Sequence, residues 1–138
     1  MKYTVGLATE EDIQRILPYT TENSKVDWKV VRESHEVRVF LCDGEPIMVL
    51  GLMEMPSADD VNTAAVWGLF RYDVHKHVLP LVRVTKDLMF TRVGYRFVVF
   101  VDDAEPKFKR YAEFLGFKPT KELANLGGKV YRYYIKES

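Results

Sequence analysis

Four basic or potentially basic side chains gather near the middle of the chain: Arg71, His75, Lys76 and His77. They precede a segment whose apolar spacing predicts a helix, and a helix start favours negative charge because its first N–H groups have no partner within the helix. Guanidinium, imidazolium and ammonium groups hold phosphate-like anions through charge-assisted hydrogen bonds. The stretch is therefore a candidate anion site, and the alternative is a basic turn that is only solvated.

Other reactive arrangements have little support in the sequence. His75 and His77 are two residues apart, a spacing that brings side chains to one side only on a strand, so a metal site is not favoured. Cys42 is the single cysteine, which excludes an internal disulfide and favours a buried thiol. No Cys-His-acid or Ser-His-acid spacing stands out.

The first part of the chain is predicted to form a strand and then a helix. Alternation over residues 3–8 indicates the strand, and Thr9 is a helix N-cap candidate with acidic residues after it. Ile13 and Ile16 belong to the expected buried stripe, and Pro18 ends that helix. Residues 20–34 are weakly helical.

A hairpin and a central strand follow. The pair Asp43-Gly44 marks a tight turn between β-favouring segments at residues 37–41 and 47–55. Residues 64–70 are apolar on both faces, which predicts a strand in the middle of a sheet.

The anion candidate leads into a predicted helix over residues 77–93. Pro80 is tolerable there because it falls in the first turn, and Gly94 is expected to end the helix. The residues expected on or beside its buried face are Val78, Leu81, Val82, Leu88, Met89 and Val93.

The C-terminal part is predicted to add a strand, a helix and a hairpin. Residues 96–101 form the strand, and Pro106 suits the first turn of a helix. Gly116 is expected to end this helix in a left-handed conformation with Phe117 folding back. Residues 121–126 and 130–135 form the closing hairpin.

Composition limits the class of protein. The chain has 138 residues, of which 47% are hydrophobic and 29% charged, as in one globular domain spanning residues 1–138. Twenty basic and twenty acidic side chains cancel, which argues against a nucleic-acid partner. The longest apolar run is far below the roughly 20 residues of a membrane span, and the acidic start does not suit a signal peptide. A soluble cytoplasmic protein is expected.

The order of these elements resembles the GNAT acetyltransferase fold over essentially the whole chain. Residues 6–12, Gly-Leu-Ala-Thr-Glu-Glu-Asp, look like the family's opening strand and helix start, and residues 114–117, Phe-Leu-Gly-Phe, look like the end of its last helix. The resemblance implies an α/β (α+β) fold with a mixed, mostly antiparallel sheet of about seven strands and about four helices.

The resemblance also implies an acetyl-CoA site, with a phosphate-binding loop after the fourth strand. The corresponding stretch here is residues 69–80, and it contains no glycine. Side chains at every position keep main-chain N–H groups from closing around a diphosphate, and Asp73 adds charge of the wrong sign. The cofactor contacts that the resemblance implies would come from Leu69, Arg71, His75, Lys76 and His77.

Two further positions differ from the family pattern: the position of the general acid and a position beside the pantetheine arm. The resemblance places a tyrosine acid four residues before Gly116, where this chain has Ala112. Tyr111 is adjacent, but a shift of one residue rotates a helical side chain by about 100°. The alternative for Tyr111 is packing at the edge of the core. Phe108 stands where the family has a small residue and is expected to fill space that a pantetheine arm would use.

The general base has several candidates in this sequence. Glu54 interrupts an otherwise apolar strand beside the cleft that the resemblance implies, and it is the preferred base. The alternative for Glu54 is a strand-end carboxylate that reaches solvent. Asp102, Asp103 and His35 are the other candidates.

Two functions from different classes remain open. The chain also looks like the small acetyltransferase-like internal virion proteins of some podophages, through Trp67, the glycine-free turn, and the basic residues Arg83, Lys86 and Arg92. That resemblance implies a non-catalytic structural or interaction protein that needs no cofactor and has a protein partner, either an assembly component or a second copy. It would act in the virion or the host cytoplasm.

The alternative is an acetyl-CoA-dependent N-acetyltransferase acting on a small amine or a protein amine, with Glu54 as base and Tyr111 as acid. A pocket for another small ligand is a third, weaker reading. The tyrosines near the C-terminus, Tyr131, Tyr133 and Tyr134, are candidates for an interface, although alternating core packing explains Tyr131 and Tyr133 equally well.

Overall fold

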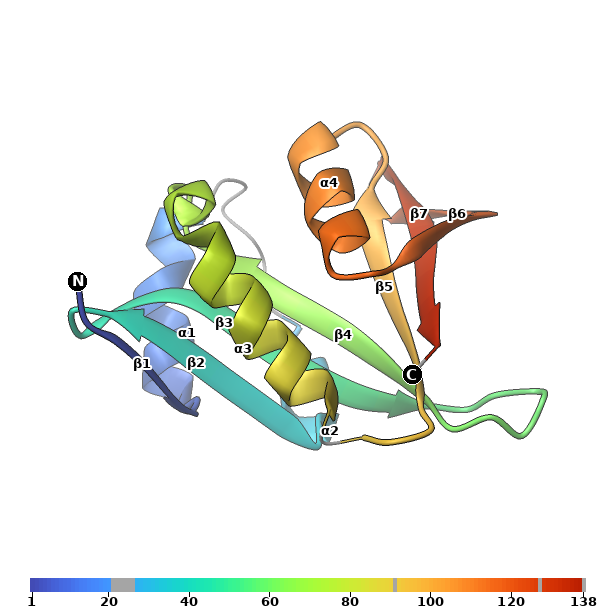
Figure 1. Cartoon of the computed structure of the whole chain (residues 1–138), viewed down its shortest axis with the longest axis horizontal. Helices are drawn as coiled ribbons and strands as arrows, with labels where there is room; N and C mark the ends of the chain where they lie inside the picture. The colour runs from blue at the N-terminus through green and yellow to red at the C-terminus, as the bar shows by residue number, and fades with distance from the viewer. Residues whose placement is uncertain (21–26, 91, 127, 138) are drawn as a thin grey trace. The chain divides into compact units, whose positions relative to one another are not determined.

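The computed structural model describes residues 1–20, 27–90, 92–126 and 128–137. In these ranges it has seven strands, four α-helices and two short 3₁₀ helices (η), coloured along the chain in Figure 1. In chain order they are β1 (Tyr3–Leu7), α1 (Glu10–Ile16), η1 (Leu17–Tyr19), α2 (Trp28–Glu33), β2 (Glu36–Cys42), β3 (Glu45–Met55), β4 (Thr63–Phe70), η2 (Val74–His77), α3 (Val78–Phe90), β5 (Arg96–Asp102), α4 (Pro106–Phe114), β6 (Lys118–Leu126) and β7 (Lys129–Glu137).

The strands form one mixed sheet in the order β1-β2-β3-β4-β5-β7-β6. The pairs β1–β2, β2–β3, β5–β7 and β6–β7 are antiparallel, and β4 pairs with β5 in parallel. The mostly antiparallel sheet of seven strands with four helices is therefore confirmed, as is the central position of β4.

Two compact units make up the described chain. The first comprises Met1–Met53 and Trp67–Asp87, and the second comprises Glu54–Val66 and Leu88–Ser138.

In the first unit, helices cover both faces of the strands, with α1 behind β2 and β3 and α3 in front of them in Figure 1. The rear face buries a cluster that joins α1 to three strands: Ile13, Ile16, Val39, Val49 and Leu69. Thr9 caps α1 as predicted, because its Oγ1 accepts a hydrogen bond from the N–H of Asp12 (3.2 Å), and the Asp12 carboxylate accepts one from the N–H of Thr9 (2.9 Å).

Gly51 lies directly against the side chain of Trp67 in this unit. A Cβ atom on Gly51 would overlap the indole ring of Trp67, so the strand can pass under the ring only as glycine. The indole Nε1 donates a hydrogen bond to Ser34 Oγ (2.8 Å), at the end of α2. Trp67 thus links β3 and β4 to α2.

Three expectations for the helices need correction or completion. The helix predicted to reach residue 93 ends at Phe90, and Gly94 (φ +79°) lies in a turn beyond it. Val93 is therefore 91% exposed, because the helical repeat no longer applies to it, and Val78 at the helix start is 36% exposed. Of the weakly helical segment 20–34, residues 28–33 form α2, and residues 21–26 lie outside the described residues.

The second unit packs α4 against β5, and β7 lies between β5 and β6. Pro106 begins α4, and Gly116 ends it at φ +95° with the N–H of Phe117 bonded to the carbonyl of Ala112 (3.0 Å), as predicted. The closing hairpin is longer at its outer ends than expected. Tyr134, offered as an interface residue, is buried at 2% exposure.

Candidate functional site

The turn between β4 and α3 carries the candidate anion-binding residues. Within it, the Arg71 guanidinium donates two hydrogen bonds to the Asp73 carboxylate, from Nε to Oδ1 (2.6 Å) and from Nη2 to Oδ2 (2.9 Å). The Arg71 guanidinium holds the pKa of Asp73 below its usual value, and Asp73 raises the pKa of Arg71. The charge of Arg71 is thus matched inside the turn rather than directed at a ligand.

Four main-chain N–H groups of this turn already have hydrogen-bond partners. A pyrophosphate cradle needs several N–H groups that point at the ligand and have no other partner. Four N–H groups here donate to carbonyl oxygens of the same unit: Arg71 to Ile47 (3.0 Å), Tyr72 to Tyr19 (2.8 Å), Val74 to Arg71 (2.9 Å) and Lys76 to Asp73 (3.0 Å). Because these four N–H groups already have partners, they are not available to the phosphates of an acyl-CoA.

The remaining cofactor candidates separate into buried and exposed residues. Leu69 lies in the rear core cluster, so only its main chain could reach a ligand. His77 is 5% exposed, and its Nδ1 lies 2.8 Å from the hydroxyl of Tyr3. Of the predicted cofactor contacts, only His75 and Lys76 have exposed side chains.

Tyr3 was not identified from the sequence. It lies 74 residues from His77, and the two rings meet edge to face with centroids 5.6 Å apart. Desolvation raises the pKa of Tyr3, and the nearby Cys42 and Asp43 add to the effect. The alternating pattern of residues 3–8 predicted the strand that contains Tyr3, but it gave no signal for the contact with His77.

The preferred base, Glu54, lies in the second unit near the end of β3. Its side chain is exposed, and its Oε1 accepts a hydrogen bond from the hydroxyl of Tyr95 (2.7 Å). This hydrogen bond raises the pKa of Tyr95, and desolvation adds to it. Tyr95 and Glu54 are 41 residues apart in the sequence, so no local pattern predicts their contact. The carboxylate of Glu54 is thus anchored on one side.

The candidate acid, Tyr111, lies on α4 in the same unit and is half-buried. Ala112, at the position where the resemblance implies an acid, is 4% exposed and contributes to the core. Phe108 is half-buried on the same helix. The catalytic role of Tyr111 and the space-filling role of Phe108 stay predictions.

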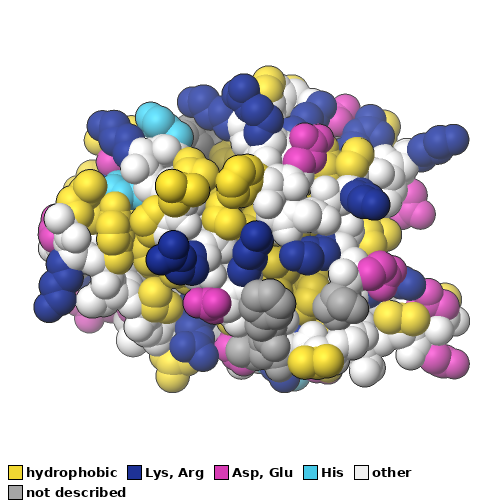
Figure 2. All heavy atoms as spheres, in the orientation of Figure 1, with side chains coloured by type: hydrophobic (Ala, Val, Ile, Leu, Met, Phe, Trp, Pro, Cys, Tyr) yellow, Lys and Arg dark blue, Asp and Glu magenta, His cyan; other side chains and the backbone are white. Residues whose placement is uncertain are grey.

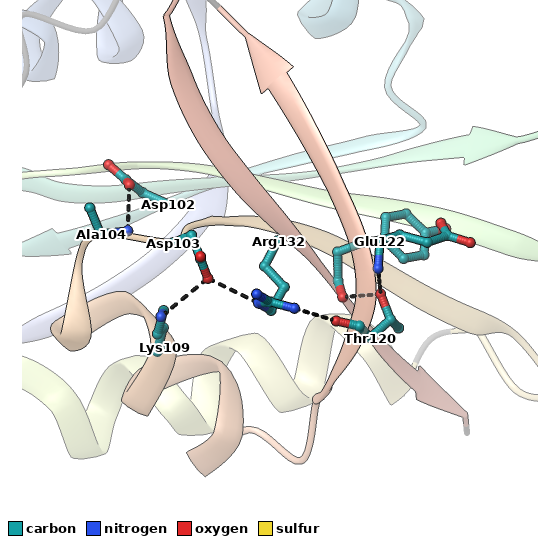
Figure 3. Close-up of polar contacts among 8 residues, drawn as sticks. Asp102, Asp103, Ala104, Lys109, Thr120, Glu122 and Arg132 are labelled. Atoms are coloured by element: carbon teal, nitrogen blue, oxygen red, sulfur yellow. Dashed lines mark hydrogen bonds and ion pairs between the residues drawn. The ribbon is translucent and has the colours of Figure 1, made fainter.

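Two alternative bases have structural partners, shown in Figure 3. Asp103 accepts a hydrogen bond from Arg132 Nε (2.9 Å) and forms an ion pair with Lys109 Nζ (3.2 Å), which together hold its pKa below the usual value. Arg132 also donates from Nη1 to the carbonyl of Thr120 (2.8 Å), and Asp102 accepts from the main chain two residues on. These contacts fasten the loop between β5 and α4 to β7 and β6.

Among the described residues, no group of three or more His, Cys, Asp or Glu side chains is arranged to hold a metal ion. None of the helices in the described ranges is long and apolar enough to cross a membrane. On the face drawn in Figure 2, Lys and Arg side chains are spread over the surface, with fewer Asp and Glu side chains scattered among them.

The comparisons with known proteins concern the fold. No family model matches the sequence, and no curated protein matches it. Among solved structures, Arabidopsis thaliana Naa50 in complex with the bisubstrate analogue CoA-Ac-MVNAL is similar over 100% of both chains, with a TM-score of 0.77 and 8% identity.

Two further solved structures have the same architecture. A GNAT family acetyltransferase from Streptococcus agalactiae has a TM-score of 0.72 and 11% identity over 99% of this chain and 95% of its own. The aminoglycoside acetyltransferase AAC(6')-Ib, solved with coenzyme A and kanamycin, has a TM-score of 0.69 and 15% identity over 99% and 95% of the two chains. At these identities the likeness establishes the fold alone.

Proposed function

Starting from the GNAT acetyltransferase fold, which this chain has, we propose that it is a non-catalytic structural or interaction protein. One observation carries the proposal: in the turn between β4 and α3, four main-chain N–H groups and the arginine already have partners within the same unit. An acetyltransferase of this fold would need that turn to be open toward the phosphates of acetyl-CoA.

Opening the turn would cost free energy. Each main-chain hydrogen bond contributes about 1 kcal/mol net, so releasing the four N–H groups of the turn would cost several kcal/mol before any phosphate is bound. Releasing Arg71 would leave the Asp73 carboxylate without its partner and close to an incoming anion. This cost opposes acyl-CoA binding.

The groups left at the turn are a weak substitute. His75 and Lys76 are exposed, and an exposed ion pair contributes about 0–1 kcal/mol. Two such side chains do not offset the loss of a cradle. The proposal accordingly requires no cofactor.

Within this class we propose an assembly role, such as that of an internal virion or assembly protein of a phage, in the host cytoplasm or the particle. Support comes from the similarity noted for Trp67 and for the basic residues Arg83 and Lys86 of α3. Peptide mass spectrometry of purified virions of the phage that encodes this chain tests this role. Stoichiometric presence of the chain supports it, and absence from the particles contradicts it.

Thermal unfolding with and without acetyl-CoA tests the proposal at the turn. A ligand at about 1 mM with a Kd near 10 μM would stabilise the fold by about 2.7 kcal/mol, a rise in Tm of several degrees. We expect a shift below about 1 °C. A shift of several degrees that is lost in Lys76→Ala would contradict the proposal, and exposed Lys107→Ala is the matched control.

An acetyl-CoA-dependent N-acetyltransferase remains the second candidate, because Tyr95 anchors the Glu54 carboxylate at the end of β3. In that reading Glu54 takes a proton from a small amine or a protein amine, and Tyr111 supplies one. Any acetyl transfer should then fall by about 10²-fold or more in Glu54→Gln and in Tyr111→Phe. The exposed Glu113→Gln is the matched control, and unchanged transfer in both site variants rules the candidate out.

A further inference from the structure

The outer edge of β1 is the free end of the sheet, since β1 stands first in the strand order. Two hydrogen bonds fix which main-chain groups of this segment face β2: the N–H of Ala8 donates to Val37 (2.9 Å), and the carbonyl of Lys2 accepts from Asp43 (2.8 Å). Successive residues of a strand direct their N–H and C=O groups to opposite sides. The main-chain N–H and C=O groups of even-numbered residues of β1 therefore bond to β2, and those of odd-numbered residues point away from β2.

Tyr3, Val5 and Leu7 thus present their N–H and C=O groups outward. Within the described ranges of the chain, the sheet has no strand beyond β1. The side chains of Val5 and Leu7 are 46% and 71% exposed. Hydrophobic side chains reach the surface in the part of Figure 2 where Figure 1 places β1 and the start of α3. The edge is both unpaired and apolar.

The opposite edge of the sheet differs. β6 carries Pro119, Lys118 and Lys121, and its pairing with β7 shifts register between Pro119 and Leu123. Proline, lysine and irregular pairing are the usual features that keep an edge strand from pairing with another chain. β1 has no charged residue or proline and pairs with β2 without a shift in register. The features that prevent pairing with another chain are therefore found on the β6 edge and not on the β1 edge.

We propose that β1 pairs antiparallel with β1 of a second copy of this chain, about a two-fold axis at Val5. In this register Val5 lies opposite Val5 of the second copy, and Tyr3 lies opposite Leu7 of the second copy. All three outward-facing residues are then in hydrogen-bonded positions, which gives about six main-chain hydrogen bonds across the axis. A shift by two residues leaves at least one of them unpaired.

Charge complementarity points to a second copy rather than to another peptide. In the same register Lys2 lies opposite Ala8 of the second copy, beside the acidic first turn of its α1. That turn carries Glu10 and Glu11, and Lys2, Glu10 and Glu11 are all exposed. The two-fold axis repeats this juxtaposition at both ends of the paired strands. Symmetric contacts of this kind define a two-fold homodimer.

The pairing should be weak. A stable protein–protein interface buries about 1,200–2,000 Å² in total, and one strand edge with two apolar side chains covers less. We therefore expect a reversible dimer with a Kd in the micromolar range or above. The inference goes beyond the proposed function and does not depend on whether acyl-CoA binds.

Sedimentation equilibrium over a wide concentration range tests the pairing. The wild type should dimerise, and Val5→Lys should raise the dimer Kd by roughly tenfold or more, because two like charges would then lie opposite each other. Leu123→Lys adds the same charge on the other edge strand, at a residue that is 55% exposed, and should leave the Kd unchanged. Circular dichroism confirms that each variant is folded.

A charge exchange tests the register itself. Val5→Glu alone should raise the dimer Kd in the same way, and a mixture of Val5→Lys with Val5→Glu should dimerise more tightly than either variant alone, since opposite charges meet across the axis. A wild type that stays monomeric into the millimolar range overturns the proposal. A dimer that Val5→Lys does not weaken, or a mixture that dimerises no more tightly than the single variants, overturns it as well.

Discussion

Arg71 and Asp73 form a two-point ion pair, with N–O distances of 2.6 and 2.9 Å, inside the turn that links β4 to α3. The pair spans two residues and matches the one arginine of the turn with the one carboxylate beside it. The sequence resemblance implied phosphate contacts from this turn. The pair and the bonded N–H groups make it a closed structural element.

The ion pair predicts a dependence of stability on pH. The pKa of Asp73 is lowered in the folded state, so its contribution is present above the unfolded pKa, near 4, and is lost as the pH falls through the lower folded pKa. Asp73→Asn should therefore lose less unfolding free energy than the wild type between pH 7 and about pH 3. At pH 7 the variant should be less stable by about 1 kcal/mol or less.

Urea unfolding at the two pH values measures this difference. Asp87→Asn, an exposed carboxylate of α3, is the control and should follow the wild type. If the unfolding free energy of Asp73→Asn decreases as much as that of the wild type when the pH is lowered from 7 to about 3, the ion pair does not contribute to stability.

The contact of Gly51 with Trp67 predicts a large effect of one methyl group. Gly51→Ala should destabilise the protein by about 2–3 kcal/mol, because the indole ring must move and leave its hydrogen bond to Ser34. Gly6→Ala is the matched strand control, since nothing lies within 4 Å of its added Cβ, and it should change stability by less than about 1 kcal/mol. Equal urea midpoints for the two variants would refute the packing described for Trp67.

The end of α4 predicts a conformational cost. Gly116 has φ +95°, so Gly116→Ala should lose about 1–2 kcal/mol of unfolding free energy. Gly116→Asn should lose less, because asparagine adopts the left-handed conformation more readily. Chemical denaturation gives both values. Alanine that is tolerated better than asparagine would contradict the left-handed cap.

Elements governed by local chemistry could be predicted from the sequence. The Thr9 cap, the Asp43-Gly44 turn and the Gly116 helix end each depend on residues a few positions apart, and all three are found. The apolar repeat failed at Val93, because nothing local shows that the helix ends before it.

The candidate site was predictable in composition but not in arrangement. Sequence grouped Arg71 with His77, yet the partner of His77 is Tyr3, 74 residues away, and the N–H of Arg71 bonds to Ile47. Tyr95 reaches Glu54 across 41 residues. Such contacts depend on how the strands pair, which no local spacing encodes.

Calorimetric titration of acetyl-CoA into the wild-type protein tests the closed turn most directly. We expect no heat beyond dilution up to about 1 mM ligand, with the same result for Arg71→Ala and Lys76→Ala. Saturable binding with a micromolar Kd in the wild type, lost in either variant, would contradict it.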